Sequence, residues 1–418
     1  MRDVVRAGES IRIALLVWDL SISGGSQRQA LELARYLMGR GHVVRVYCGY
    51  LSRSKCYPDL LRKLDVVCLH ERDYVEGRNN FLRWVLYPPE PLFTGQAKAL
   101  ADMMPDGGFD LVNCHDFMVY RSAYYYKRAN KVPVVWMVND LPRSLVGPKS
   151  GLGGGSMKDL LHYLILGGPL GHRSDLRRVR ALDKCVVFDK PTAEAFAKKV
   201  GVAPVRMGSG LDSSVFECRP RSKAPDRKKL KVLDVGVFYP HRRYEDLLNA
   251  VALAKKDGVM AEVMIVGSDA YDKIYASGTR ELASALGLQN EVKFICNVTE
   301  EELRRLYADA DVFVFPNYPQ TWGLAPFEAM ASGTPVIVST GAGASEVMTD
   351  GENALLVPPG RPEAIASCLV RLCDDGELYV RLSRNGRRFV EENISWNAYG
   401  MRMEALFKET LSKPGGEK

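Results

Sequence analysis

Short apolar runs alternate with segments of helical periodicity along the whole chain, a pattern that predicts repeated strand–turn–helix units. Residues 11–18 are almost continuously apolar, as expected for a parallel strand that is buried on both faces. Between Ala30 and Leu37, apolar residues recur at three- and four-residue spacing, and Gly41 marks the end of a helix. Residues 43–48 form the next strand, so this segment is one β-α-β unit.

The same alternation continues in both halves of the sequence. Four further strands are predicted in the first half, at 64–69, 111–114, 132–138 and 184–188. Six strands are predicted in the second half, at 232–237, 262–267, 292–296, 312–316, 335–339 and 354–357, with helices at 244–256, 279–286, 300–308 and 396–411. This order predicts an α/β fold made of two doubly wound domains.

A basic stretch at 218–231 separates the two series of strands. Its Arg and Lys residues stand against a single acidic residue, Asp226. We interpret it as a solvated linker between a first domain at 11–217 and a second at 232–395, with an anionic membrane contact as the alternative. Residues 1–10 are predicted to be disordered, and 396–418 to form a last helix and tail. The Gly-, Pro- and Ser-rich residues 142–156 predict a long loop.

Composition narrows the class of protein. The 418 residues are 46% hydrophobic and 26% charged, which is typical of soluble globular chains. The net charge of +7 favours anionic ligands without indicating nucleic acid. Nine scattered cysteines without a Cys-x-x-Cys pair favour a reducing compartment. Since no apolar run has the length of a membrane helix and the N-terminus lacks a signal-peptide core, a cytoplasmic protein is predicted.

The segment 316–346 carries the most specific chemical pattern. Gly323 allows a turn after a strand, Pro326 suits the start of a helix, and Gly333 ends that helix. A helix N-terminus at the carboxyl end of a parallel strand is a site for anions. Glu328 lies in the first turn, where its carboxylate could accept both hydroxyls of a ribose; the alternative is that it only complements the helix dipole.

The spacing Gln320-x7-Glu328, followed by Ala-Met-Ala-Ser-Gly-Thr-Pro-Val-Ile, resembles the E-x7-E signature of retaining glycosyltransferases of family four. Gly24-Gly25 and the segments 209–212, 341–346, 350–353 and 355–360 resemble the same family, in the same order along nearly the whole chain. The resemblance implies the GT-B fold, in which two Rossmann-like domains face an interdomain cleft and the last helix crosses back to the first domain.

The resemblance also implies an activity. It indicates a retaining, metal-independent hexosyltransferase that moves a sugar from a UDP- or GDP-sugar to a glycan or lipid-linked acceptor, as in polysaccharide or glycolipid biosynthesis. No cofactor and no metal is expected, and the sequence has no His/Cys cluster or aspartate pair with metal-ligand spacing.

Roles for individual residues follow from the resemblance. Glu328 matches the glutamate that binds the donor ribose. Backbone N–H groups at two glycine-containing turns would contact the donor sugar and its phosphates, namely those of Gly24, Gly25, Gly323, Leu324 and Ala325.

The sequence departs from the family pattern at three positions. Gln320 replaces the first glutamate of the signature, Val237 replaces an arginine, and Asn139 replaces a histidine on the acceptor side. Arg242 stands where the family has a lysine, and Arg242 with Arg243 could neutralise the leaving diphosphate. The alternative is a solvated surface pair.

His115 follows a buried strand at the edge where site residues are expected. It is predicted to contact the donor sugar or the acceptor; the alternative is a helix-capping pair with Asp116. Arginines near the apolar segment 160–170, together with Lys184, suggest peripheral contact with an anionic membrane at its inner face; these are Arg173, Arg177, Arg178 and Arg180.

Two other functions remain open from the sequence. Gln320 and Val237 are compatible with a catalytically degenerate module that only binds a nucleotide-sugar. A sugar-phosphate synthase on the same fold is the other alternative.

Overall fold

The computed structural model divides the chain into two compact units. Unit 1 comprises residues 1–207 and 399–418, and unit 2 comprises 208–398. Within them, the structure describes residues 10–71, 90–116, 118–139, 145, 168–269, 272–296, 298–319 and 322–412, with the backbone alone at 90–93 and 168–170. The expected disordered residues 1–9 therefore lie outside the described residues, and so does the expected loop 142–156 apart from Leu145.

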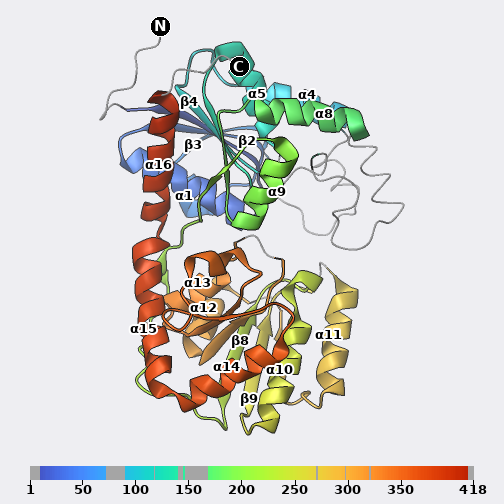
Figure 1. The fold of residues 1–418 in the computed structure, drawn as a ribbon. Helices are drawn as coiled ribbons and strands as arrows, with labels where there is room; N and C mark the ends of the chain where they lie inside the picture. Colours follow the sequence, from blue (N-terminus) through green and yellow to red (C-terminus); the bar gives the residue numbers. More distant parts are fainter. Residues whose placement is uncertain are drawn as a thin grey trace. The chain divides into compact units, whose positions relative to one another are not determined.

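Unit 1 is built on a seven-stranded parallel sheet in the order β3-β2-β1-β4-β5-β6-β7 (Figure 1). Its strands are β1 (Arg12–Leu20), β2 (Val43–Leu51), β3 (Asp65–Glu71), β4 (Leu111–His115), β5 (Val134–Met137), β6 (Lys184–Val187) and β7 (Val205–Arg206). Its helices are α1 (Gly25–Gly39), α2 (Pro58–Leu61), α4 (Glu90–Asp102), α5 (Tyr120–Asn130), α8 (Gly168–Arg180), α9 (Lys190–Val200) and most of α16 (Trp396–Ser412).

The strands of unit 1 are apolar because both faces of the sheet are covered. Eight of the nine residues of β1 are buried, as the continuous apolar run predicts. The aromatic core lies on one face, where Trp136 packs against Tyr120 and Phe196 with ring centroids 4.8 and 6.2 Å apart. Such packing fixes the strand ends that carry the polar residues of this unit.

Unit 2 repeats the design with six parallel strands in the order β10-β9-β8-β11-β12-β13. The strands are β8 (Leu230–Val235), β9 (Ala261–Val266), β10 (Val292–Ile295), β11 (Val312–Phe315), β12 (Val336–Ser339) and β13 (Leu355–Val357). The helices are α10 (Tyr244–Lys256), α11 (Lys273–Ala285), α12 (Glu300–Asp309), α13 (Ala325–Ala331), α14 (Pro362–Asp374) and α15 (Gly376–Asn393), with short 3-10 helices η1 (Ser213–Val215), η2 (Pro240–Arg242) and η3 (Gly343–Val347).

Each sheet has one topological switch point, where the strand order reverses. In unit 1 it lies between β1 and β4, and in unit 2 between β8 and β11. Ligands of open α/β sheets bind outside the carboxyl ends of the strands at such points. The loops after β1, β4, β8 and β11 are therefore the ones to search for a site.

The α/β prediction of two doubly wound parallel sheets is confirmed. Among the helices, α11 begins six residues earlier than predicted, because the carboxylate of Asp272 accepts a hydrogen bond from Tyr275 N and caps the helix there. The sequence analysis predicted no helix between 354 and 395, whereas the structure has the helices α14 and α15 there.

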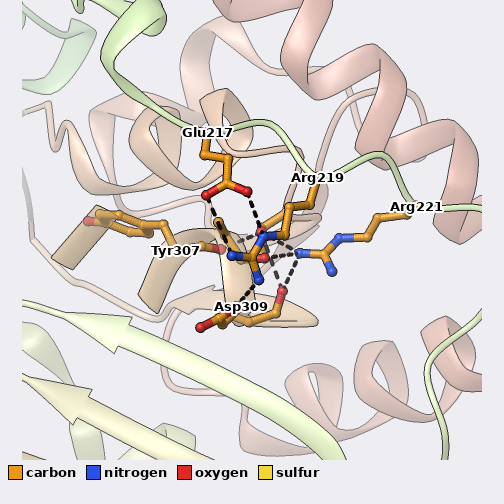
Figure 2. A network of polar contacts seen from close by, with 8 residues as sticks. Glu217, Arg219, Arg221, Tyr307 and Asp309 are labelled. Atoms are coloured by element: carbon orange, nitrogen blue, oxygen red, sulfur yellow. Dashed lines mark hydrogen bonds and ion pairs between the residues drawn. The ribbon is translucent and has the colours of Figure 1, made fainter. Parts of the chain in front are cut away.

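The whole basic stretch 218–231 falls within unit 2, and two of its arginines contact α12. Figure 2 shows Arg219 between Glu217 and Asp309, to both of which it is paired. Beside it, Arg221 Nη2 donates to the carbonyls of Ala308 and Ala310 at 2.8 and 2.7 Å. These carbonyls end α12 and attract cations, so Arg221 is held by a helix C-terminus, whereas Arg219 is held by carboxylates.

Among the residues described by the structure, no helix is both long and apolar enough to cross a bilayer. Most of the apolar segment 160–170 lies outside the described side chains. Three of the basic residues near it are engaged within unit 1: Arg178 pairs with Asp175, Arg180 Nε donates to the carbonyl of Val200, and Lys184 pairs with Glu409.

Candidate functional site

The loops after β8 and β11 meet at the switch point of unit 2. The backbone N–H of Tyr318, two residues after Pro316, donates to the carbonyl of His241 at 2.8 Å. Next to it, the buried amide of Asn317 faces Arg242: in the orientation that satisfies both groups, Oδ1 accepts from Arg242 Nη1 at 2.8 Å and Nδ2 donates to the Arg242 carbonyl at 3.3 Å. The two loops thus form one surface at the carboxyl edge of the sheet.

The guanidinium of Arg242 lies directly over Gly236, the residue that follows β8. A Cβ atom at position 236 would be 2.7 Å from Arg242 Cζ and Nε and 2.9 Å from Nη1. Within the described residues, the buried Nε of Arg242 has no hydrogen-bond partner. The glycine therefore makes room for a cation whose donors are not all used by the protein.

Arg243 is held differently from its neighbour. It adopts a left-handed backbone conformation with φ 57° immediately before α10. Its Nε and Nη2 donate to the two carboxylate oxygens of Asp246 at 2.9 and 3.0 Å, and Nη1 lies 3.2 Å from Glu245. Two carboxylates therefore match the charge of Arg243. Arg242 and Arg243 are adjacent in the sequence, but their side chains lie in different environments.

Asp234 is a fully buried carboxyl on β8, two residues before Gly236. By distance and angle, neither of its oxygens has a hydrogen-bond partner in the described part of the chain. Burial raises the pKa of Asp234 from 3.8 to about 8, although the nearby charge of Arg242 and, more weakly, the backbone N–H of Val235 act in the opposite direction. A carboxyl of this kind holds its proton at neutral pH.

Glu328 is positioned by a residue from another helix. The hydroxyl of Tyr307, which is fully buried on α12, donates to Glu328 Oε2 at 2.7 Å. Burial raises the pKa of Tyr307 well above its ordinary value, and the nearby carboxylate of Glu328 raises it further, so this hydroxyl stays a donor. Glu328 itself is half-buried in the first turn of α13.

The backbone before α13 has the predicted turn. Gly323 has φ 87°, a conformation that other residues adopt at a cost, and Leu324 and Ala325 lead into the helix. The N–H groups of a first helical turn have no intrahelical acceptor, so those at Leu324 and Ala325 are placed for a ligand. Gln320, the altered residue of the signature, lies outside the described residues.

In unit 1, Gly24 and Gly25 begin α1 after β1, as predicted. Gly24 is the N-cap with extended backbone, and its carbonyl accepts from Arg28 N at 3.0 Å and from the hydroxyl of Tyr57 at 3.2 Å. A Cβ atom at Gly25 would meet nothing within 4 Å, and this glycine is exposed. The backbone here is open to a ligand, although sterics alone do not require glycine at position 25.

His115 ends β4 and is completely buried. Asn113 Nδ2 donates to the carbonyl of Val135 at 3.0 Å, which leaves Asn113 Oδ1 as the acceptor for His115 Nε2 at 2.9 Å. Burial lowers the pKa of His115 to about 3, so the imidazole is neutral at physiological pH. Its buried Nδ1 is an acceptor without a partner among the described residues.

Asp116 does not cap α5, because the N-cap of that helix is Val119 and no side chain caps it. Asp116 has φ 75°, and its Oδ1 accepts from Met118 N at 2.7 Å in the turn before α5, while Oδ2 accepts from Trp18 N at 2.9 Å. Asn139 lies two residues beyond Met137, the strand partner of His115, at the same edge of the sheet. Its side-chain atoms have no partner within the described ranges.

Three site residues were not found from the sequence. Asp234 could have been found from the sequence, because it is a charged residue near the end of a largely apolar strand. Asn317 follows the end of β11, where polar residues of a site are expected. Tyr307 could not have been found in this way, since its contact with Glu328 joins residues 21 positions apart on two helices.

No group of three or more His, Cys, Asp or Glu residues that could hold a metal ion occurs within the described ranges. The expectation of a metal-free reaction stays a prediction.

Two parallel-sheet Rossmann-like units, each with polar residues at its switch point, define a chain of the GT-B class. The sequence matches the family described as Glycosyltransferase Family 4 over residues 23–208 and that described as Glycosyl transferases group 1 over 216–389. The chain belongs to this glycosyltransferase family and is a transferase enzyme.

Known proteins resemble the chain over most of its length. An uncharacterised glycosyltransferase of Methanocaldococcus jannaschii is 25% identical over 97% of this chain and 100% of the relative. A D-inositol 3-phosphate glycosyltransferase of Salinispora tropica is 32% identical over 90% of this chain and 79% of the relative. The crystal structure of Anabaena HepE with UDP and glucose has a TM-score of 0.69 at 16% identity, covering 96% of this chain and 100% of HepE.

Proposed function

We propose that this glycosyltransferase moves a hexosyl group, with retention of configuration, from a UDP- or GDP-sugar to a hydroxyl of a glycan or lipid-linked acceptor. The observation that carries the proposal is the pair of groups at the switch point of unit 2: a guanidinium over Gly236 with an unused donor, and the carboxylate of Glu328 held by Tyr307. A cation and a diol acceptor at one sheet edge suit a nucleoside diphosphate.

In the proposed reaction, the bond between the anomeric carbon and the diphosphate oxygen breaks as the acceptor oxygen arrives on the same face of the sugar. The acceptor proton passes to the leaving diphosphate. Negative charge grows on that diphosphate, and Arg242 stabilises it with a fixed cation in a partly buried site. We propose that this cation and the N–H groups before α13 suffice without a metal.

Glu328 is proposed to accept the two ribose hydroxyls, with Tyr307 fixing its rotamer. In unit 1, the neutral His115 and Asn139 are proposed to contact the transferred sugar and the acceptor. The open turn at Gly24-Gly25 is proposed to contact the donor phosphate. The unpartnered Nδ1 of His115 supports its proposed contact with a sugar, because a buried acceptor is stabilised when a hydroxyl donates to it.

The relatives support the donor class. HepE was crystallised with UDP and glucose, and the Salinispora relative is named for transfer to D-inositol 3-phosphate. Both fit a nucleoside-diphosphate leaving group and a hydroxyl acceptor, which is why UDP is the first nucleotide to test here.

Thermal unfolding with UDP, GDP, ADP and CDP tests the donor site. A nucleotide at 100 times its dissociation constant should add about 2.7 kcal/mol, a shift of a few degrees. The Arg242→Ala variant should lose the shift, whereas Arg227→Ala, which removes an exposed arginine paired with Asp374, should keep it. A full shift in Arg242→Ala would refute the phosphate assignment.

The stereochemistry is tested separately by NMR. Slow hydrolysis of an α-linked donor should release the α-anomer of the free sugar first, before mutarotation, and at the same rate with and without EDTA. Release of the β-anomer would refute retention, and loss of turnover in EDTA would refute metal independence.

A further inference from the structure

The carboxyl of Asp234 has no role in the reaction as described so far, although it is buried beside the proposed diphosphate cation. Buried acids without hydrogen bonds are costly, since the group loses its water and gains nothing in return. Asp234 has no exposed surface, and neither oxygen has a partner in the described part of the chain. The burial of this acid beside Arg242 therefore needs an explanation in terms of the proposed diphosphate site.

The geometry of β8 places this carboxyl next to Arg242. Side chains two residues apart on a strand point to the same face, so Asp234 faces the side on which a Cβ of Gly236 would lie. Position 236 still belongs to the sheet, because Gly236 N donates to the carbonyl of Val266 at 2.8 Å. The Arg242 guanidinium fills that side of Gly236, with Cζ 2.7 Å from the position of the missing Cβ. The acid and the arginine are neighbours on one face without an ion pair between them.

The other ionisable groups near Asp234 are tyrosines from the helices packed against the sheet: Tyr244 on α10, Tyr275 on α11 and Tyr307 on α12. Burial raises the pKa of each phenol, so all three remain neutral. Beyond them lie Glu245, bonded to Tyr275, and Glu328, bonded to Tyr307. Among these described neighbours Arg242 is the cation, and its position can depend on whether Asp234 is charged.

We propose that Asp234 is a positioning residue that sets how much of the Arg242 charge is available to the donor diphosphate. As a neutral acid it leaves the guanidinium charge unmatched, and the diphosphate then provides the counter-charge. As a carboxylate it would draw the guanidinium inward along β8 and compete with the diphosphate. The inference rests on the proposed binding of a nucleoside diphosphate at Arg242.

The sign of the pH dependence follows from linkage. Burial, opposed by the charge of Arg242, raises the pKa of Asp234 from 3.8 to about 8. A bound diphosphate adds negative charge nearby and raises this pKa further, so the ligand prefers the protonated enzyme. Donor affinity should therefore be highest below pH 8 and fall as the pH rises through that value. If binding raises the pKa by one unit, the loss approaches about tenfold at pH values well above both the free and the bound pKa.

The test measures the dissociation constant of UDP, or of whichever of GDP, ADP and CDP stabilises the enzyme most, at pH 7 and pH 9 by calorimetry. For a one-unit rise in pKa on binding, the wild type should lose about fivefold in affinity between these values. The neutral isostere Asp234→Asn should bind as well as the wild type at pH 7 and keep that affinity at pH 9. The matched control is Asp311→Asn, since Asp311 precedes β11 at the opposite edge of the sheet and accepts from Lys231 N at 2.9 Å. It should follow the wild type.

In turnover, the same pH dependence should appear in kcat/KM for the donor, and Asp234→Asn should remove it. A purely structural role would lower stability in Asp234→Asn at every pH, whereas the proposal predicts that the variant is the more stable protein at pH 8. This is because the folded wild type retains a proton between pH 4 and 8, so its stability declines across that range. Asp234→Ser provides a second neutral side chain should the amide fail to fold.

An Asp234→Asn enzyme whose affinity falls with pH as the wild type's does would overturn the proposal. So would a tenfold weaker affinity of this variant at pH 7. If no nucleoside diphosphate binds the wild type at any pH, the proposed function itself fails. This result can be told apart from the two outcomes above, because it is obtained on the wild type alone.

Discussion

Replacement of Gly236 by alanine tests the place of Arg242 without removing its charge. The new methyl group would be 2.7 Å from the guanidinium carbon, whereas ordinary contacts begin near 3.4 Å, so the guanidinium must move by about 0.7 Å or more. The backbone permits alanine, since Gly236 is not among the glycines with positive φ. Displacements of this size at a catalytic cation cost about 10- to 100-fold in rate.

The same substitution should be mild for stability. The moved guanidinium loses its hydrogen bond to Asn317, about 1 kcal/mol, and the replacement of a glycine offsets part of that by restricting the unfolded chain. Gly267→Ala should be far more destabilising, because its Cβ would collide with the carbonyl oxygen of Gly236. That oxygen belongs to the backbone of the sheet and cannot move aside as a side chain can. We expect that variant to unfold or to lose several degrees of melting temperature.

The assay is donor kcat/KM together with chemical unfolding. Gly236→Ala should lose at least tenfold in kcat/KM with less than about 1 kcal/mol in stability. The matched control is Gly278→Ala on α11, where a methyl group would meet nothing within 4 Å and activity should be unchanged. Added to Arg242→Ala, the Gly236 change should have no further effect, because both act on one group. Full activity in a folded Gly236→Ala enzyme would refute the assignment of Arg242.

Three further outcomes are expected. Tyr307→Phe removes the hydroxyl that holds Glu328 and should raise the donor KM about fivefold, roughly 1 kcal/mol, with kcat unchanged; an unchanged KM would contradict the role of this contact. His115 should show no imidazole titration by NMR between pH 5 and 8, because burial lowers its pKa to about 3; its contribution to stability then falls only as the pH drops below 6.5. Glu404→Gln should lower the free energy of unfolding by about 1–2 kcal/mol at pH 7, measured in urea. Burial raises the pKa of Glu404, but hydrogen bonds from Lys408, His42 and Tyr36 outweigh it and lower the pKa to about 2, so this stability is lost as the pH falls from 4.5 through 2; a pH-independent difference would contradict it.

The strands were predictable because burial on both faces leaves a simple trace in the sequence. The run 11–18 predicts β1 to within two residues at each end, since a parallel strand in the middle of a sheet is apolar throughout. The start of α11 was missed because the cap at Asp272 lies before the apolar periodicity begins.

The site was predictable where it depends on local chain geometry. Gly323 needs a left-handed turn and Glu328 follows at fixed spacing, so both can be read along the chain. Contacts between distant segments leave no such trace: the side chains of Arg242 and Arg243 differ because one faces Gly236 and the other Asp246, which no spacing rule distinguishes. The contacts of Arg221 with α12 were not predicted for the same reason, since its hydrogen-bond partners lie about 90 positions away in the sequence.

The last helix, α16, belongs mostly to unit 1, although the rest of that unit ends at Met207. Tyr36 packs against Gly400, and its hydroxyl donates to Glu404 at 3.2 Å. During synthesis on the ribosome, this part of unit 1 must wait for about 200 more residues, roughly 10–40 s of translation, while unit 2 is already complete in one continuous segment. The unit that is made first is therefore the one that finishes folding last, because the face of α1 that carries Tyr36 is covered only after α16 has been made.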